Sequence, residues 1–113
     1  MIDRSGINPN LVEDVSVGSV LPPGGGATEF RAASLVAGFP ETTAVRSLNR
    51  QCSSGLQATV DIANALKSGM IDVGIGAGVE SMSFQYGYVR PCFSGCLAWT
   101  GLLTVFVLLD LVP

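Results

Sequence analysis

The chain has 113 residues, of which 48% are hydrophobic and only 13% charged, and its formal net charge is −3. This length allows one domain with a modest core. The charged share is about half the usual one, so much of the surface is expected to be covered. The mild negative charge, without a basic cluster, argues against a nucleic-acid-binding protein. With no histidine and three cysteines, we expect neither a metal site nor a disulfide framework.

The first half of the chain predicts strands alternating with helices. Residues 12–21 show the apolar alternation of a strand, and the sequence "PPGGG" at 22–26 is typical of a loop. A helix is expected from a cap at Thr28 to a stop signal at Gly38. Residues 43–48 are rich enough in β-branched side chains for a short strand.

Residues 53–68 predict a helix that is apolar almost all round. Leu56 and Val60 fall on one side of it, Ala58 and Ile62 fall on the other, and the polar stripe between them is narrow. A helix with this pattern is typically buried on most of its surface.

Residues 72–80, "DVGIGAGVE", predict a third strand with two different faces. One face carries apolar side chains, and the other carries only glycine. Such a glycine face lets another backbone approach closely. The resulting order β-α-β-α-β favours a mostly parallel sheet with right-handed crossovers, so the predicted fold class is α/β.

The sequence changes character from Phe84 onward and ends in a nearly apolar run. Its uninterrupted part, 102–109, is too short to cross a bilayer as a helix, which needs about 20 residues. Three interpretations stay open for this segment. It is an extra core strand, a nonnative tail from altered splicing or a changed reading frame, or a membrane-seeking tail.

Cys52 is the candidate nucleophile. It lies in "LNRQCSSGLQ" (48–57), between a predicted strand and the start of a predicted helix. Amide N–H groups and the helix dipole favour a thiolate there, and the same amides can stabilise an oxyanion on a substrate. Ser53, Ser54 and Gly55 leave space above the sulfur. The alternative is a small buried thiol, which is the common environment of a cysteine.

Two residues near Cys52 have supporting interpretations. Gly55 in the first turn costs helix stability, so we expect a ligand or another segment to approach closely there. Glu80 is either an acid–base group or a support for a loop. Because no paired carboxylate is visible, the second interpretation of Glu80 is favoured.

Three stretches in register resemble the thiolase family. "SLNRQCSSGLQA" is similar to the acyl-enzyme cysteine signature, "AGVESMS" resembles the stretch that follows it, and "VEDVSVGSVLPPG" fits the amino-terminal domain. The sequence around Cys52 is most similar to that of the 3-ketoacyl-CoA thiolases of fatty-acid β-oxidation, especially their peroxisomal branch. We therefore expect an incomplete thiolase-type domain at 1–83, with a buried nucleophile helix, and a divergent apolar tail at 84–113.

The resemblance implies an acyltransferase that cleaves 3-ketoacyl-CoA into acetyl-CoA and a shortened acyl-CoA. Cys52 would carry the acyl group as a thioester, and its backbone N–H would contribute to an oxyanion hole. Coenzyme A is then a substrate, and no cofactor or metal is expected. A homodimer and a peroxisomal location are implied, although the targeting segment of that branch is not expected in this chain. Neither nucleic acid nor a membrane is an expected partner.

The sequence departs from the family in its proton-transfer groups. Thiolases activate the nucleophile with a histidine and use a second cysteine at the acetyl α-carbon, but this chain has no histidine. Cys92 and Cys96 do not match the motif of that second cysteine. The family's first strand and helix would also precede Ile7. We therefore expect the chain to be inactive alone. The alternatives are a noncatalytic fragment that acts only through subunit association, and a decarboxylating condensing enzyme of the same fold.

Overall fold

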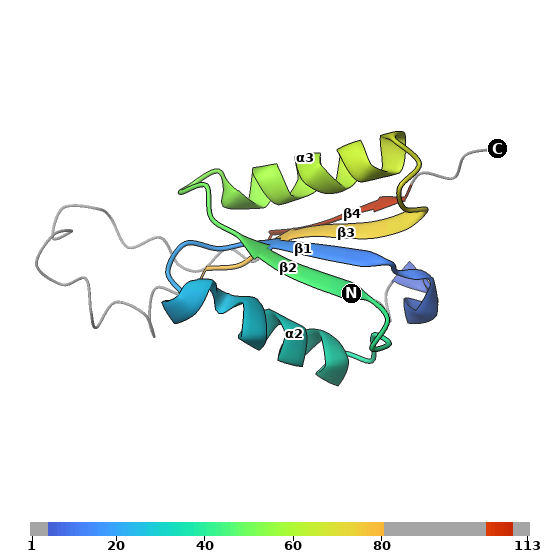
Figure 1. Cartoon of the computed structure of the whole chain (residues 1–113), viewed down its shortest axis with the longest axis horizontal. Helices are drawn as coiled ribbons and strands as arrows, with labels where there is room; N and C mark the ends of the chain where they lie inside the picture. The colour runs from blue at the N-terminus through green and yellow to red at the C-terminus, as the bar shows by residue number, and fades with distance from the viewer. Residues whose placement is uncertain (1–4, 81–103, 110–113) are drawn as a thin grey trace, which may run out of the picture.

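A computed structural model describes residues 5–80 and 104–109, which form a four-stranded sheet with a helix on each face (Figure 1). The strand order is β2-β1-β3-β4, with β1 parallel to β2 and β3, and β4 antiparallel to β3. The strands are β1 (Asp14–Gly18), β2 (Ala44–Leu48), β3 (Val73–Gly78) and β4 (Thr104–Leu109). The helices are α2 (Ala27–Val36) and α3 (Ser54–Lys67), with short 3-10 turns η1 (Pro9–Leu11) and η2 (Pro23–Gly26). This arrangement confirms the predicted α/β class and element order.

Helix α2 begins earlier than its predicted cap. Gly26 is the N-cap and has a φ of 76°, and no side chain caps the helix. Gly24 and Gly25 also have positive φ, at 66° and 81°. Glycine adopts this backbone region without a steric penalty, so the glycine run turns directly into the helix. The prediction that Thr28 caps α2 is therefore wrong, and Thr28 lies inside the helix.

One apolar cluster of the core lies on the α2 side of the sheet. Val12, Val15 and Ile75 are buried, and Val45 and Phe39 pack against them. The strand register sets Val15 opposite Val45 on one side and Ile75 on the other. The cluster joins three strands and the segment that follows α2. Because burying one such side chain stabilises a fold by about 1.5–3 kcal/mol, the cluster holds these segments together.

Helix α3 packs against the glycine face of the sheet. A Cβ on Gly76 would lie 2.6 Å from the Cα of Thr59, and a Cβ on Gly18 would overlap the carbonyl group of Ser54. Both contacts show that the helix backbone packs directly against the strand backbones, with no room for a side chain between them. The predicted close approach at the glycine face is confirmed.

The burial of α3 is narrower than its sequence predicts. Ala58, Ile62 and Leu66 face the sheet and are buried. Leu56 on the opposite side is 68% exposed, and Val60 is 41% exposed. In this chain the predicted buried helix is thus covered on one face only.

The apolar segment near the carboxyl end contributes strand β4. Thr104 pairs with Gly78, and Leu109 pairs with Val73, in an antiparallel register. Among the three interpretations of this segment, the structure agrees with the extra strand. The predicted domain boundary between residues 83 and 84 falls outside the described residues. None of the helices in the described ranges is long and apolar enough to span a membrane.

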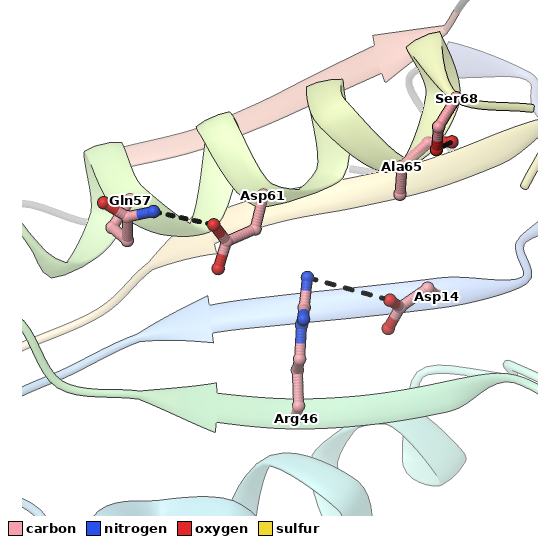
Figure 2. A network of polar contacts seen from close by, with 6 residues as sticks. All are labelled: Asp14, Arg46, Gln57, Asp61, Ala65 and Ser68. Atoms are coloured by element: carbon pink, nitrogen blue, oxygen red, sulfur yellow. Dashed lines mark hydrogen bonds and ion pairs between the residues drawn. The ribbon is translucent and has the colours of Figure 1, made fainter. Parts of the chain in front are cut away.

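The ion pair between β1 and β2 contributes little to the stability of the sheet. Figure 2 shows Arg46 of β2 reaching Asp14 of β1, with 3.9 Å between nitrogen and oxygen. It also shows Gln57 donating to Asp61 one turn further along α3, at 2.6 Å. A solvent-exposed ion pair contributes at most about 1 kcal/mol, so the sheet is held mainly by backbone pairing and apolar packing.

Candidate active site

The carboxyl ends of the three parallel strands meet at one edge of the sheet, and Cys52 follows β2 at that edge. Backbone bonds join the segments there. The amide of Ser19 donates to the carbonyl of Leu48 at 3.1 Å. The amide of Val79 donates to the carbonyl of Gly18, also at 3.1 Å. Substrates of open α/β sheets bind outside this edge, so the position of Cys52 suits a reactive group.

Cys52 is a free, exposed thiol. It lies one residue before Ser53, the N-cap of α3, as the sequence predicts. The positive end of a helix dipole stabilises a nearby thiolate. The alternative of a small buried thiol is therefore wrong for this chain, and the nucleophilic role of Cys52 stays a prediction.

Ser54 closes the turn around Cys52. Its hydroxyl donates to the carbonyl of Gln51 at 2.6 Å and accepts from the amide of Arg50 at 2.8 Å. The side chain is buried, since Ser54 is only 3% exposed. The space predicted above the sulfur stays a prediction, and the structure adds a second role for Ser54, whose hydroxyl holds the two residues before Cys52. A serine at a helix start is the sequence signal for such a bond.

Gln51, directly before Cys52, has a φ of 52°. A residue other than glycine in this region is strained by about 1–3 kcal/mol and persists only where its surroundings hold it. The Oδ1 of Asn49 accepts from the amide of Gln51 at 3.0 Å. The Nδ2 of Asn49 donates to the carbonyl of Val20 at 3.3 Å. The strained turn is thereby anchored to the loop after β1.

The amides on the carboxyl side of Cys52 are engaged within the turn. The amide of Ser53 donates to the carbonyl of Arg50 at 3.2 Å, and that of Ser54 donates to the carbonyl of Gln51 at 3.1 Å. These two N–H groups therefore already have acceptors. The contribution of the Cys52 amide to an oxyanion hole stays a prediction.

Gly55 brings the start of α3 onto the end of β3. A Cβ on Gly55 would lie 3.4 Å from the Cα of Gly78, and one on Gly78 would lie 3.0 Å from the Cα of Gly55. The close approach predicted at Gly55 is thus to another segment of the chain. This contact sets the start of α3, and with it Cys52, over the carboxyl edge of the sheet.

Glu80 supports the loop that follows β1. One carboxylate oxygen accepts from the amide of Val20 at 2.9 Å. The other accepts from the amide of Leu21 at 3.1 Å and from the hydroxyl of Ser19 at 3.4 Å. These contacts confirm the loop-supporting interpretation of Glu80.

The other thiols and a metal site are the remaining points of the sequence analysis. Cys92 and Cys96 lie outside the described residues. Within residues 5–80 and 104–109, no three histidine, cysteine, aspartate or glutamate side chains gather as a metal site. The expectation that no cofactor is used stays a prediction.

Residues 1–98 match the family described as "Thiolase, N-terminal domain". The chain belongs to the thiolase family. It is 60% identical over 87 residues to the peroxisomal 3-ketoacyl-CoA thiolase of Yarrowia lipolytica, a match that covers 77% of this chain and 21% of the relative. The chain thus spans about a fifth of the length of the curated relatives it matches.

Solved thiolase structures have the same fold as this chain. The dimeric peroxisomal thiolase of Saccharomyces cerevisiae is 56% identical, with a TM-score of 0.69 that covers 73% of this chain and 21% of that one. A second structure of the peroxisomal 3-ketoacyl-CoA thiolase of Saccharomyces cerevisiae is 55% identical, with a TM-score of 0.68, and covers 71% of this chain and 23% of that one. It is described as five layers, α-β-α-β-α, built from two core domains of identical topology.

Proposed function

We propose that Cys52 accepts the acyl group in the thiolytic cleavage of a 3-ketoacyl-CoA. The observation that carries this proposal is the exposed thiol at the start of α3, at the carboxyl edge of the sheet. The relatives that share 60% and 56% identity with the chain are named peroxisomal thiolases. A condensation or cleavage at a thioester suits sulfur, which is both a good nucleophile and a good leaving group.

The reaction has two steps on the Cys52 sulfur. In the first, the thiolate attacks the 3-keto carbon, the bond between C2 and C3 breaks, and a proton must reach the departing acetyl-CoA carbon. This leaves the acyl group on Cys52 as a thioester. In the second, the thiol of free coenzyme A attacks that thioester and loses its proton. The shortened acyl-CoA leaves, and the Cys52 thiolate is restored.

The chain supplies the nucleophile but lacks the proton-transfer groups that the family resemblance implies. Its sequence contains no histidine, so no imidazole is present to take the thiol proton. We infer that the 113-residue chain does not turn over alone. The missing groups belong to the greater part of a thiolase, which this chain does not match.

The test follows acetyl-CoA release and the mass of the Cys52 peptide after incubation with a 3-ketoacyl-CoA. We expect no acetyl-CoA above the Cys52→Ala control. With an acyl-CoA in excess, thioester exchange should add an acyl mass to Cys52, and free coenzyme A should remove it. Clear turnover would contradict the inactivity of the chain alone. Equal labelling of Cys92 and Cys96 would contradict the role of Cys52.

Location and assembly follow the same relatives. Because these relatives are named peroxisomal and one is named dimeric, we propose a peroxisomal location and a homodimeric parent enzyme. Coenzyme A and acyl-CoA are the proposed small-molecule partners.

The second candidate function is subunit association without catalysis. The exposed side of α3, formed by Leu56 and Val60, favours it. The yeast enzyme stacks two core domains of identical topology into five layers, and one such domain by itself has an outer helix face to cover. The proposed occupant is a thiolase core domain on a second chain. The mass of the chain in solution tests this candidate.

A further inference from the structure

The carboxylate of Glu80 is connected to the turn of Cys52 by a continuous series of hydrogen bonds. Glu80 accepts from the amide of Val20 at 2.9 Å, and the carbonyl of Val20 accepts from the Nδ2 of Asn49 at 3.3 Å. The Oδ1 of Asn49 accepts from the amide of Gln51 at 3.0 Å. The series joins the three segments that follow β1, β2 and β3, and it ends directly before Cys52.

The properties of this series suit it to hold a strained turn. The bonds from the 19–21 loop to Glu80 are partly buried and assisted by its charge, which makes them stronger than neutral ones. Asn49 uses both ends of its side-chain amide, one toward the loop and one toward the turn, in two solvent-exposed bonds. Gln51 needs such support, because its φ of 52° is unfavourable for a side chain.

We propose that Glu80 and Asn49 are positioning residues that fix Cys52 at the start of α3. The proposal rests on the proposed function, since it assigns a role toward the same thiol. Neither residue needs to touch a substrate. When the series is broken, Gln51 relaxes toward negative φ and Cys52 moves away from its position at the start of α3.

A matched control lies at the opposite edge of the sheet. The carboxylate of Glu13 accepts from the amides of Asp72 and Val73, at 2.5 and 3.4 Å. It resembles Glu80 in joining the segments beside β1 and β3. It differs in lying at the amino end of β3, whereas the turn of Cys52 lies at the carboxyl end. The Glu13 bonds are exposed and use one carboxylate oxygen, whereas those of Glu80 are partly buried and use both. Glu13→Ala therefore removes carboxylate bonds between these segments without touching the proposed series.

The first experiment compares the 113-residue chain with Glu80→Ala, Glu80→Gln and Glu13→Ala. Amide exchange is measured over residues 49–53, and the rate of iodoacetamide alkylation is measured on the Cys52 peptide. For Glu80→Ala we expect exchange about tenfold faster in this segment and alkylation about threefold slower at fixed pH. Glu80→Gln keeps one acceptor oxygen and should lie between. Glu13→Ala should leave both measurements unchanged.

The second experiment asks whether Glu80 acts through Asn49. Asn49→Ala removes both the acceptor for Gln51 and the donor to Val20 and adds no charge near Cys52. If the two residues form one series, the double variant with Glu80→Ala should be no slower in alkylation than the slower single variant. Fold-changes that multiply would overturn the proposal. So would faster exchange confined to residues 19–21 with the turn unchanged, since that outcome assigns Glu80 to the loop alone.

The proposed function and this inference fail separately. If the alkylation and exchange results hold but Cys52 accepts no acyl group from an acyl-CoA, the acyl-transfer role fails and the positioning series stands. If Cys52 is acylated and the Glu80→Ala and Glu13→Ala variants behave alike, the positioning role fails alone.

Discussion

Ser54 holds the turn into α3 from within the turn itself. Its buried hydroxyl is both a donor and an acceptor, toward the backbone on either side of the strained Gln51 peptide. A hydroxyl used in this way lets a chain without a glycine at position 51 keep a tight turn before Cys52. The geometry of the candidate nucleophile is therefore set by its sequence neighbours as well as by the sheet.

Replacing this hydroxyl should destabilise the fold. Ser54→Ala leaves the amide of Arg50 and one carbonyl lone pair of Gln51 without their partner in a partly buried site. Each lost bond of this kind costs about 0.5–1.5 kcal/mol. Urea unfolding measures the loss. Ser68→Ala is the matched control, because Ser68 makes one exposed bond to the carbonyl of Ala65 at the other end of α3 (Figure 2). A loss for Ser68→Ala as large as that for Ser54→Ala would contradict this account.

At the scale of elements, the packing of α3 on the sheet depends on the absence of side chains. Gly18 and Gly76 lie directly beneath the helix backbone, and this face of the sheet contributes little apolar area. The helix in return supplies Ala58 and Ile62, which are fully buried. The start of α3 is close to the strand ends only because glycine stands at these positions.

Adding one methyl group beneath α3 should separate it from the sheet. The Cβ of Gly18→Ala would overlap the carbonyl group of Ser54, so backbone must move, at a cost of about 1–3 kcal/mol or more. Gly55→Ala is the control on the same helix. Its Cβ meets Gly78 at an ordinary 3.4 Å, and alanine is the better helix former by about 1 kcal/mol. The urea midpoints of unfolding for Gly18→Ala and Gly55→Ala measure the two changes in stability, and we expect a lower midpoint for Gly18→Ala alone. Equal losses would show that overlap with α3 is not the limiting contact.

The elements were predictable because their signals are local. Periodicity indicates the strands and helices, and the glycine alternation of 72–80 indicates the close face. The hydrogen bonds of Glu80 reach about 60 positions back along the chain, so no local pattern contains them. The same holds for Asn49 and Val20, which are 29 positions apart. The exposure of Leu56 does not follow from the sequence, because an apolar pattern shows what a helix can bury, whereas its burial depends on what covers it.

At the scale of the whole molecule, both helical layers leave apolar side chains uncovered, with Val36 of α2 at 89% exposure and Leu56 of α3 at 68%. They lie on opposite faces of the sheet (Figure 1). Only 13% of the chain is charged, which leaves few polar groups to keep these faces in water. Association through one face is therefore expected, and the proposed face is that of α3, which also carries the candidate nucleophile at its start.

Substitution on α3 should decide whether it is the association face. Leu56→Glu with Val60→Glu places two charges on the exposed side of α3, and burying an unpaired charge is strongly unfavourable. We expect the unsubstituted chain to exceed the monomer mass of 11.7 kDa in light scattering, and the double variant to return to it. Loss of even about 1.4 kcal/mol weakens association tenfold. Val36→Glu on α2 is the control and should leave the mass unchanged. A monomeric unsubstituted chain, or equal dissociation by Val36→Glu, would show that α3 is not the face through which this chain associates.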